Sequence, residues 1–131
     1  MKSPELVPSL EAEKPCVLVV EDEFLVRYGI SDELREAGFR VVEANNADEA
    51  WKYLTAGGCA DLIFSDVQMP GTMNGIELAR RARTEFPAIP LILTSGNTDP
   101  KTIGGIAPFV HKPYRTGEVI SLIAETLKAS R

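Results

Sequence analysis

Four short apolar runs in this sequence are each followed, within two residues, by a side chain suited to binding a cation or a phosphate. The runs lie at 17–20, 62–64, 91–93 and 109–110. Short runs of this kind predict buried strands of a parallel sheet. Ligands of an open α/β sheet bind beyond the carboxyl ends of its strands. The polar residues at the ends of the runs should therefore meet at one edge of the sheet: Glu21, Asp22, Asp66, Thr94 and Lys112.

Strand-like and helix-like patterns alternate along the chain. Strands are expected at 16–20, 40–44, 61–65, 90–94 and 108–111. Helices are expected at 23–37, between a cap at Asn46 and a stop at Gly57, and at 74–86, 98–107 and 116–129. Five repeats of strand then helix predict an α/β fold, a doubly wound three-layer sandwich with a parallel five-stranded sheet and helices on both faces.

Two of these helices carry specific expectations. In the first, which Gly38 should end, apolar residues recur at helical spacing: Leu25, Val26, Gly29, Ile30 and Leu34. The fourth contains the pair Gly104-Gly105, and two adjacent glycines cost a helix about 2 kcal/mol relative to alanine. This fourth helix is therefore expected to be short or mobile.

Bulk properties indicate one folded domain. The 131 residues suffice for one core, and no apolar run approaches the roughly 20 residues of a membrane-spanning helix. We expect a flexible extension at 1–14 and a domain at 15–131. The net charge of −5 argues against a nucleic-acid surface. The two cysteines, Cys16 and Cys59, predict free buried thiols and a reducing, cytoplasmic setting.

Four segments together resemble the receiver domains of two-component response regulators: Val19–Glu23, Asp66–Gly71, Leu93–Gly96 and Phe109–Pro113. Each segment is a weak signal alone, but all four occur in order at predicted strand ends, and the likeness extends over about 14–128. The resemblance implies a CheY-like, flavodoxin-like fold with the strand order 2-1-3-4-5. It also implies a phosphoacceptor signalling protein of a two-component or phosphorelay system, which is a switch rather than an enzyme.

The resemblance assigns roles around the phosphoryl group. Asp66 would accept it as a carboxylate nucleophile that forms an aspartyl phosphate. Lys112 would pair with the acceptor carboxylate and then with the phosphoryl oxygens, and Thr94 would hydrogen-bond the new group. Phe109 would turn inward as Thr94 moves. Taken singly, each of these residues also has an ordinary structural explanation, such as a turn-starting aspartate or a strand-ending threonine.

A divalent metal site, for Mg²⁺ or Mn²⁺, is implied as well. Asp22 and Asp66 would ligate the metal directly, together with the backbone carbonyl of Gln68, and Glu21 would act through water. Many receivers carry aspartate where this chain has Glu21. Apart from any metal, these acidic residues would also stabilise the start of the following helix.

The implied phosphodonor is a sensor histidine kinase or a histidine phosphotransfer protein, and neither nucleic acid nor membrane is expected as a partner. The likeness places the donor surface around two groups of residues: Phe24, Leu25, Arg27 and Tyr28, and Tyr114 and Arg115. Phosphorylation would switch the surface of the fourth strand, fourth helix and fifth strand for a downstream protein. The Lys112-Pro113 bond is implied to be cis. We expect no output domain; a natural single-domain protein and a receiver cut from a hybrid kinase both stay open.

Three other functions fit parts of the pattern. A binding module of the same fold that never meets phosphate would not need Asp22, Asp66, Thr94 and Lys112 together. A metal-dependent phosphohydrolase with Asp66 as nucleophile usually has a second carboxylate two residues later, where this chain has Gln68. A flavodoxin-like cofactor carrier needs a loop rich in glycine or hydroxyl groups after the first strand, where this chain is acidic.

Overall fold

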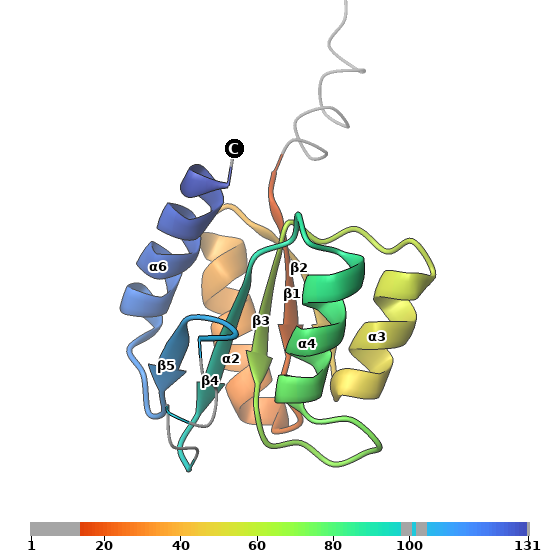
Figure 1. Cartoon of the computed structure of the whole chain (residues 1–131). Coiled ribbons are helices and arrows are strands. Elements are labelled where there is room, and N and C mark those ends of the chain that lie inside the picture. The colour runs from red at the N-terminus through yellow and green to blue at the C-terminus, as the bar shows by residue number, and fades with distance from the viewer. Residues whose placement is uncertain (1–13, 98–100, 102–104, 131) are drawn as a thin grey trace, which may run out of the picture.

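Five parallel strands form one sheet in the order β2-β1-β3-β4-β5, with β3 in the middle (Figure 1). The computed structural model describes residues 14–97, 101 and 105–130. The strands are β1 (Cys16–Val20), β2 (Arg40–Ala44), β3 (Leu62–Asp66), β4 (Leu91–Ser95) and β5 (Phe109–His111). The parallel sheet and its strand order confirm the predicted fold.

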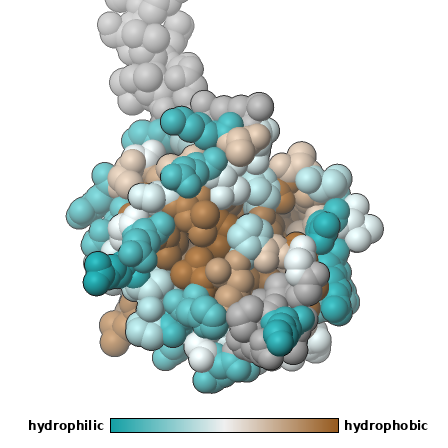
Figure 2. All heavy atoms as spheres, turned by 60° about the vertical axis from the view of Figure 1, so that its left-hand side comes forward, coloured by the Kyte–Doolittle hydropathy of each residue, from teal (hydrophilic) through white to brown (hydrophobic). Residues whose placement is uncertain are grey.

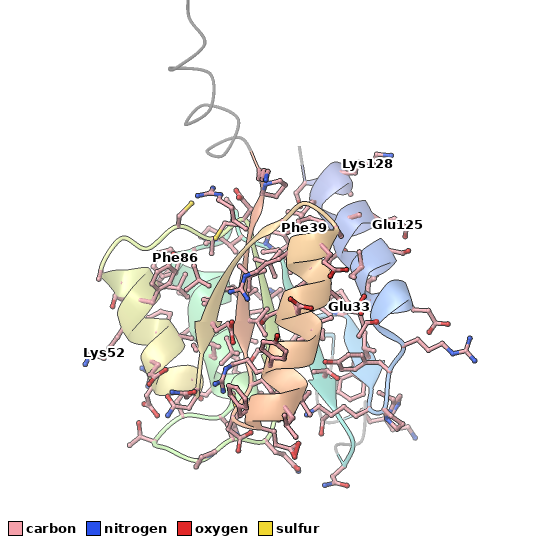
Figure 3. The ribbon with its side chains drawn as sticks, turned by 180° about the vertical axis from the view of Figure 1, so that it is seen from behind. Glu33, Phe39, Lys52, Phe86, Glu125 and Lys128 are labelled. Carbon is pink, nitrogen blue, oxygen red and sulfur yellow. The ribbon has the colours of Figure 1, made fainter. Side chains whose placement is uncertain are left out.

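The helices of the described residues cover both faces of this sheet and complete three layers (Figure 1). On one face lie α2 (Phe24–Glu36) and α6 (Thr116–Ala129), which run side by side when the molecule is seen from behind (Figure 3). On the other face lie α3 (Ala47–Thr55) and α4 (Gly75–Glu85). Phe86 follows α4 and meets the Trp51 ring of α3 edge-on, with 5.7 Å between the ring centroids.

The unbroken apolar sequence of β1 follows from its burial on both faces. Val17 and Val19 pack into the core beneath α2 and α6. Leu18 and Val20 pack into the core beneath α3 and α4. A strand that is covered on both sides has no polar face, so it shows no alternation of apolar and polar residues.

Polar caps and a glycine set the ends of the helices. Asn46 and Asn74 begin α3 and α4, because each side chain accepts a hydrogen bond of 2.9 Å from the backbone N–H three residues later. Gly38 follows α2 with a φ of +100°, a left-handed conformation that glycine adopts without a Cβ clash. The predicted cap at Asn46 and the predicted stop at Gly38 are both confirmed.

Two strands are displaced by one residue from their predicted positions. β3 ends at Asp66 rather than at Ser65, so Asp66 is a buried strand residue and not the first residue of the loop. β4 begins at Leu91 rather than at Pro90, because proline has no N–H to donate to a strand ladder.

Leu25 and Cys59 are both exposed, and for Cys59 this corrects the expectation of a buried thiol. Leu25 is 79% exposed, because the first turn of α2 borders a surface groove instead of packing on the sheet. Cys59 is exposed because it lies between α3 and β3, whereas Cys16 at the start of β1 is buried; both are free thiols. Residues 1–13 of the extension expected at 1–14, and most of the fourth helix expected at 98–107, lie outside the described residues.

A third apolar cluster lies between α4 and β5. Its buried members are Val67, Ala79 and Leu93, and Phe109 packs against them from β5. Figure 2 brings the side of β5 and α6 forward and shows hydrophobic residues gathered in the middle of this face.

None of the described helices combines the length and the apolar character that crossing a bilayer would need.

Candidate functional site

The strand register brings the predicted site residues to one end of the sheet. Asp66 at the end of β3 is the register partner of Thr94 in β4, so their side chains leave the sheet on the same side. Glu21 follows β1 directly, and its N–H donates to the carbonyl of Ala44 at the end of β2 at 3.1 Å. Lys112 follows β5 and donates its N–H to Ser95 at 3.1 Å, and its peptide bond to Pro113 is cis.

The ammonium of Lys112 joins two of these strand ends. Its Nζ lies 2.8 Å from Glu21 Oε1 and 3.3 Å from Asp66 Oδ2. The carboxylates are deeply placed, with side chains only 4% and 8% exposed for Glu21 and Asp66. A buried carboxylate is costly unless it is paired, so the lysine supplies the charge that both require.

Three carboxylates in this pocket could hold a metal ion. One oxygen each from Glu21, Asp22 and Asp66 lies within 4.8 Å of the other two. Oxygen donors of this kind suit Mg²⁺, which usually keeps several waters, and Asp22 is exposed to the solvent that would supply them. Because one ammonium pairs with two of these three carboxylates, the net negative charge of the cluster favours a further cation.

The pKa shifts of these groups also indicate an excess of negative charge in the pocket. Burial raises the pKa of Asp66 above its ordinary value, although the charge of Lys112 opposes the shift. Burial likewise raises the pKa of Glu21 against the hydrogen bond from Lys112. Burial acts to lower the pKa of Lys112, but the hydrogen bond to Glu21 and the charge of Asp66 outweigh it, and the pKa is raised. Negative charge in this pocket is thus only partly compensated.

Thr94 supplies a buried hydroxyl beside the carboxylate of Asp66. The residue is 1% exposed, and its Oγ1 has no hydrogen-bond partner among the described residues. Its backbone is fixed, because its carbonyl accepts from Val67 N–H at 2.9 Å. A buried hydroxyl without a partner costs stability, so Thr94 is ready to bond a group that enters the pocket.

The contacts of the Phe109 and Gln68 side chains are with other groups than the carboxylates. Phe109 is half-buried in the third apolar cluster, with its ring edge-on to His111 at 4.8 Å between centroids. Gln68 is exposed, and its side-chain oxygen accepts from Asn97 Nδ2 at 3.4 Å. The structure therefore brings together Glu21, Asp22, Asp66 and Lys112, with Thr94 as the register partner of Asp66, while Phe109 packs in the third apolar cluster.

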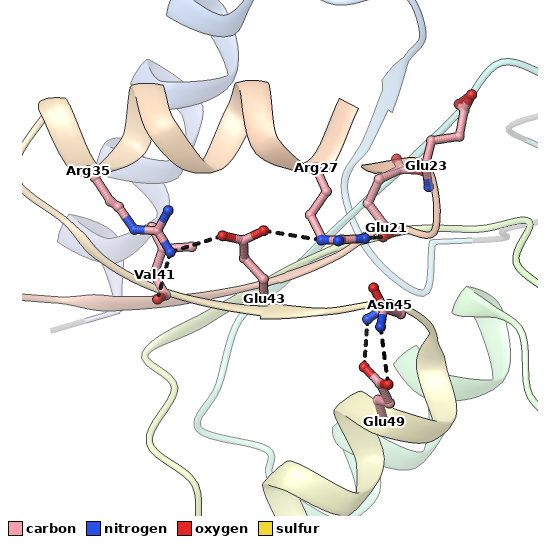
Figure 4. A network of polar contacts seen from close by, with 8 residues as sticks. All are labelled: Glu21, Glu23, Arg27, Arg35, Val41, Glu43, Asn45 and Glu49. Atoms are coloured by element: carbon pink, nitrogen blue, oxygen red, sulfur yellow. Dashed lines mark hydrogen bonds and ion pairs between the residues drawn. The ribbon is translucent and has the colours of Figure 1, made fainter. Parts of the chain in front are cut away.

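An arginine network that the sequence reasoning missed holds the backbone of Glu21 (Figure 4). Arg27 donates from Nη1 to the carbonyl of Glu21 at 2.9 Å and from Nε to Glu43 Oε1 at 3.1 Å. Glu43 on β2 also accepts from Arg35 at 3.0 Å. No local motif marks this pairing, because it depends on α2 lying next to β2.

Two further residues support the loop after β3 and were also missed. Gly75 packs so closely behind the site that an added Cβ would overlap the carbonyl oxygen of Asp66. Asp48 on α3 accepts hydrogen bonds from the N–H of Thr72, at 3.0 Å, and from its hydroxyl. The glycine directly after the cap Asn74 was the only local signal of a close approach.

An apolar groove of about 500 Å³ opens beside the site, between the first half of α2 and the segment from β5 to α6. Leu25, Val26 and Tyr114 contribute to its walls, and Lys112 reaches it from the carboxylate pocket. Phe24, Leu25 and Tyr28 on this end of α2 are 61%, 79% and 53% exposed. An exposed apolar surface of this kind often marks a protein contact.

Comparison with known proteins settles the family. A sequence model described as the response regulator receiver domain matches residues 17–124. The chain belongs to this family. Receiver domains are signalling switches of two-component systems that bind Mg²⁺ at an acidic site and interact with histidine kinases or phosphotransfer proteins, and this receiver has an acidic cluster of Glu21, Asp22 and Asp66.

The relatives of this receiver are longer proteins that each contain a matching segment. The response regulator protein FleR of Pseudomonas aeruginosa is 34% identical over 113 residues, which are 82% of this chain and 24% of that protein. The CAI-1 autoinducer sensor kinase/phosphatase CqsS of Vibrio cholerae is 30% identical over 115 residues, 82% of this chain and 17% of that protein. The chain thus spans less than a quarter of the length of these two relatives.

Solved structures bear out the fold. The crystal structure of a response regulator receiver protein from Sinorhizobium medicae WSM419 has a TM-score of 0.85 and 24% sequence identity. The match covers 92% of this chain and 99% of that one.

Proposed function

We propose that this receiver is a phosphoacceptor in which Asp66 takes a phosphoryl group from a phosphohistidine. The observation that carries the proposal is the ammonium of Lys112, held 2.8 Å from Glu21 and 3.3 Å from Asp66 at the strand ends. A carboxylate oxygen of Asp66 attacks phosphorus, and the bond from phosphorus to the donor's histidine nitrogen breaks. Lys112 is already in place to contact the phosphoryl oxygens as charge develops on them.

The same pocket would hold Mg²⁺. Asp22 and Asp66 would ligate the ion directly with the Gln68 carbonyl, while Glu21 would act through water, because its Oε1 is engaged by Lys112. When bound, the ion neutralises charge on the transferring group. Three carboxylates against one ammonium favour such a divalent cation.

Thr94 and Phe109 would form the switch. The unpartnered hydroxyl of Thr94 would donate to an oxygen of the phosphoryl group on its register partner Asp66. Movement of Thr94 would leave space that Phe109, which packs on the neighbouring strand, can occupy. The surface around β4 and β5 would then change its population of conformations and become readable by a downstream protein.

The donor would be a sensor histidine kinase or a histidine phosphotransfer protein that docks on the groove beside α2. Leu25 and Tyr114 line this groove, and Lys112 connects it to the carboxylates. A donor histidine held there would approach Asp66 from the solvent side. Leu25→Asp should slow transfer from a kinase by at least tenfold and leave transfer from acetyl phosphate unchanged, because the small donor needs no docking surface.

Acetyl phosphate with Mg²⁺, followed by intact-protein mass spectrometry, tests the acceptor. The wild-type protein should gain one phosphoryl group that depends on Mg²⁺, and Asp66→Asn should gain none. Because the product can be short-lived, a phosphorylated histidine kinase is used as a second donor. A wild-type protein that stays unmodified with both donors, or an adduct that persists in Asp66→Asn, would contradict the proposal.

A further inference from the structure

Two thiols lie together at the end of the sheet opposite the carboxylate pocket. Cys16 is the first residue of β1, and Cys59 lies just before β3. The Cys16 thiol donates to the backbone carbonyl of Cys59 at 3.3 Å. Cys16 is 2% exposed, whereas Cys59 is open to solvent. An accessible thiol therefore has a protected thiol as its neighbour.

Polar contacts hold both cysteines in this arrangement. Arg40 on β2 donates from Nη2 to Cys59 Sγ at 3.8 Å, which puts a positive charge beside the exposed sulfur. Tyr53 donates its hydroxyl to the Cys59 carbonyl at 2.7 Å. Asp61 accepts from the Cys16 N–H at 2.7 Å. Side chains from α3 and β2 thus anchor a segment that would otherwise be an ordinary surface connection.

We propose that Cys59 and Cys16 are a redox site that a hydroperoxide converts reversibly into an intramolecular disulfide. The Cys59 thiolate attacks one oxygen of hydrogen peroxide, the O–O bond breaks, and the other oxygen leaves as hydroxide, which takes up a proton to become water. Cys59 is then a sulfenic acid. The Cys16 thiol gives up its proton as it attacks that sulfur, the S–O bond breaks, and the leaving hydroxide takes up a proton to become a second water as the disulfide forms. Two thiols are oxidised and one peroxide is reduced.

The surroundings of the two thiols assign this order of events. Cys59 meets the oxidant first because it is exposed and has Arg40 beside it. Burial raises the pKa of Cys16, so this thiol stays protonated and protected until the neighbouring sulfur becomes electrophilic. Disulfides that form in a reducing compartment are typically of this transient, redox-sensing kind.

The disulfide would act on stability rather than on the carboxylate pocket. It would link the amino ends of β1 and β3, whereas Glu21 and Asp66 lie at the carboxyl ends of these strands. The closed loop would contain α2, β2 and α3, and a crosslink over a loop of this length raises the melting temperature by on the order of 10 °C. This inference does not depend on the proposed phosphoacceptor function.

Intact-mass spectrometry of the reduced protein after treatment with hydrogen peroxide tests the proposal. The wild-type protein should lose about 2 Da and regain it with dithiothreitol, and Cys16→Ala should gain about 16 Da as a sulfenic acid that dimedone traps. Cys59→Ser should stay unmodified under the same conditions. Arg40→Gln should react several-fold more slowly than the charge-retaining Arg40→Lys.

Three results would overturn the inference. The first is a wild-type protein that gains oxygen without losing the two hydrogens. The second is a covalent dimer in place of the internal disulfide. The third is a Cys16→Ala protein that reacts no faster than Cys59→Ser, because the exposed thiol would then not be the site of attack.

Discussion

Replacing Gly75 with alanine should destabilise this receiver, although alanine has a higher helix propensity than glycine. Gly75 is the first residue of α4, and its N–H donates to the Val67 carbonyl at 2.8 Å. An added Cβ would overlap the Asp66 carbonyl oxygen and lie 2.8 Å from Val67 Cα. Both obstacles are backbone atoms at the end of β3, so the clash can be relieved only if the strand or the helix shifts.

Gly29 in α2 is the matched control, because an added Cβ there meets no atom within 4 Å. Gly29→Ala should gain about 1 kcal/mol from helix propensity and raise the melting temperature by about 4 °C. The gain in helix propensity from Gly75→Ala is at most the same. It is outweighed by an overpacking cost of about 3 kcal/mol, in the upper part of the usual range, because backbone atoms have to move. The net loss is about 2 kcal/mol, or roughly 8 °C.

Urea unfolding followed by far-ultraviolet circular dichroism measures both variants against the wild-type protein. The midpoints should move in opposite directions at an unchanged slope, since neither substitution alters the surface exposed on unfolding. Phosphoryl uptake from acetyl phosphate should also slow in Gly75→Ala, because the shifted backbone carries Asp66. If Gly75→Ala proved as stable as Gly29→Ala, the close packing behind Asp66 would be refuted.

Three further predictions address groups around the site. The hydrogen bonds from Thr72 lower the pKa of Asp48. Their contribution to the stability of the fold is therefore complete above the ordinary carboxyl pKa of about 4, and it is lost as the pH falls through the lowered pKa. Asp48→Asn should therefore melt below the wild-type protein at pH 7, with a gap that closes in acid; a gap independent of pH would contradict this account. Thr94→Val should melt at least as high as the wild-type protein, because a buried hydroxyl without a partner costs about 1–3 kcal/mol; a clear drop in melting temperature would show that the hydroxyl is satisfied. Arg27→Met should weaken Mg²⁺ binding about tenfold in calorimetric titration, because it releases the Glu21 backbone. Arg35→Met should leave Mg²⁺ binding unchanged, because Arg35 donates to the other oxygen of Glu43 and to the Val41 carbonyl. Equal losses in both variants would show that the network acts through its charge and not through the position of the Glu21 backbone.

The layout of the site could be predicted because a parallel sheet gathers its strand ends. Asp66, Thr94 and Lys112 are far apart in sequence, yet each follows an apolar run, and strands that point the same way bring such residues to one edge. The strand order itself came from the family resemblance, since apolar runs alone do not tell which strands are neighbours. The metal and phosphoryl roles of these residues stay predictions.

What could not be predicted depends on contacts between elements. The exposure of Leu25 follows from where α2 begins relative to the groove, and helical spacing cannot report this. Arg27 has no local signal for its bond to Glu21, because Glu43 reaches it from β2. The one-residue shift of β3 shows the same limit, since the period of a strand does not reveal which residue pairs last.

The ion pair between Lys112 and Glu21 joins residues that are 91 positions apart. The chain between them must complete every crossover of the sheet before β5 holds the lysine in position, and contacts of such long range are slow to form. A chain that has folded only as far as β3 would have Asp66, the proposed acceptor, but would lack the ammonium of Lys112 that pairs with it. Under the proposed function, competence to receive a phosphoryl group would therefore arise only with completion of the fold, and a nascent or truncated receiver would not compete with finished molecules for phosphate.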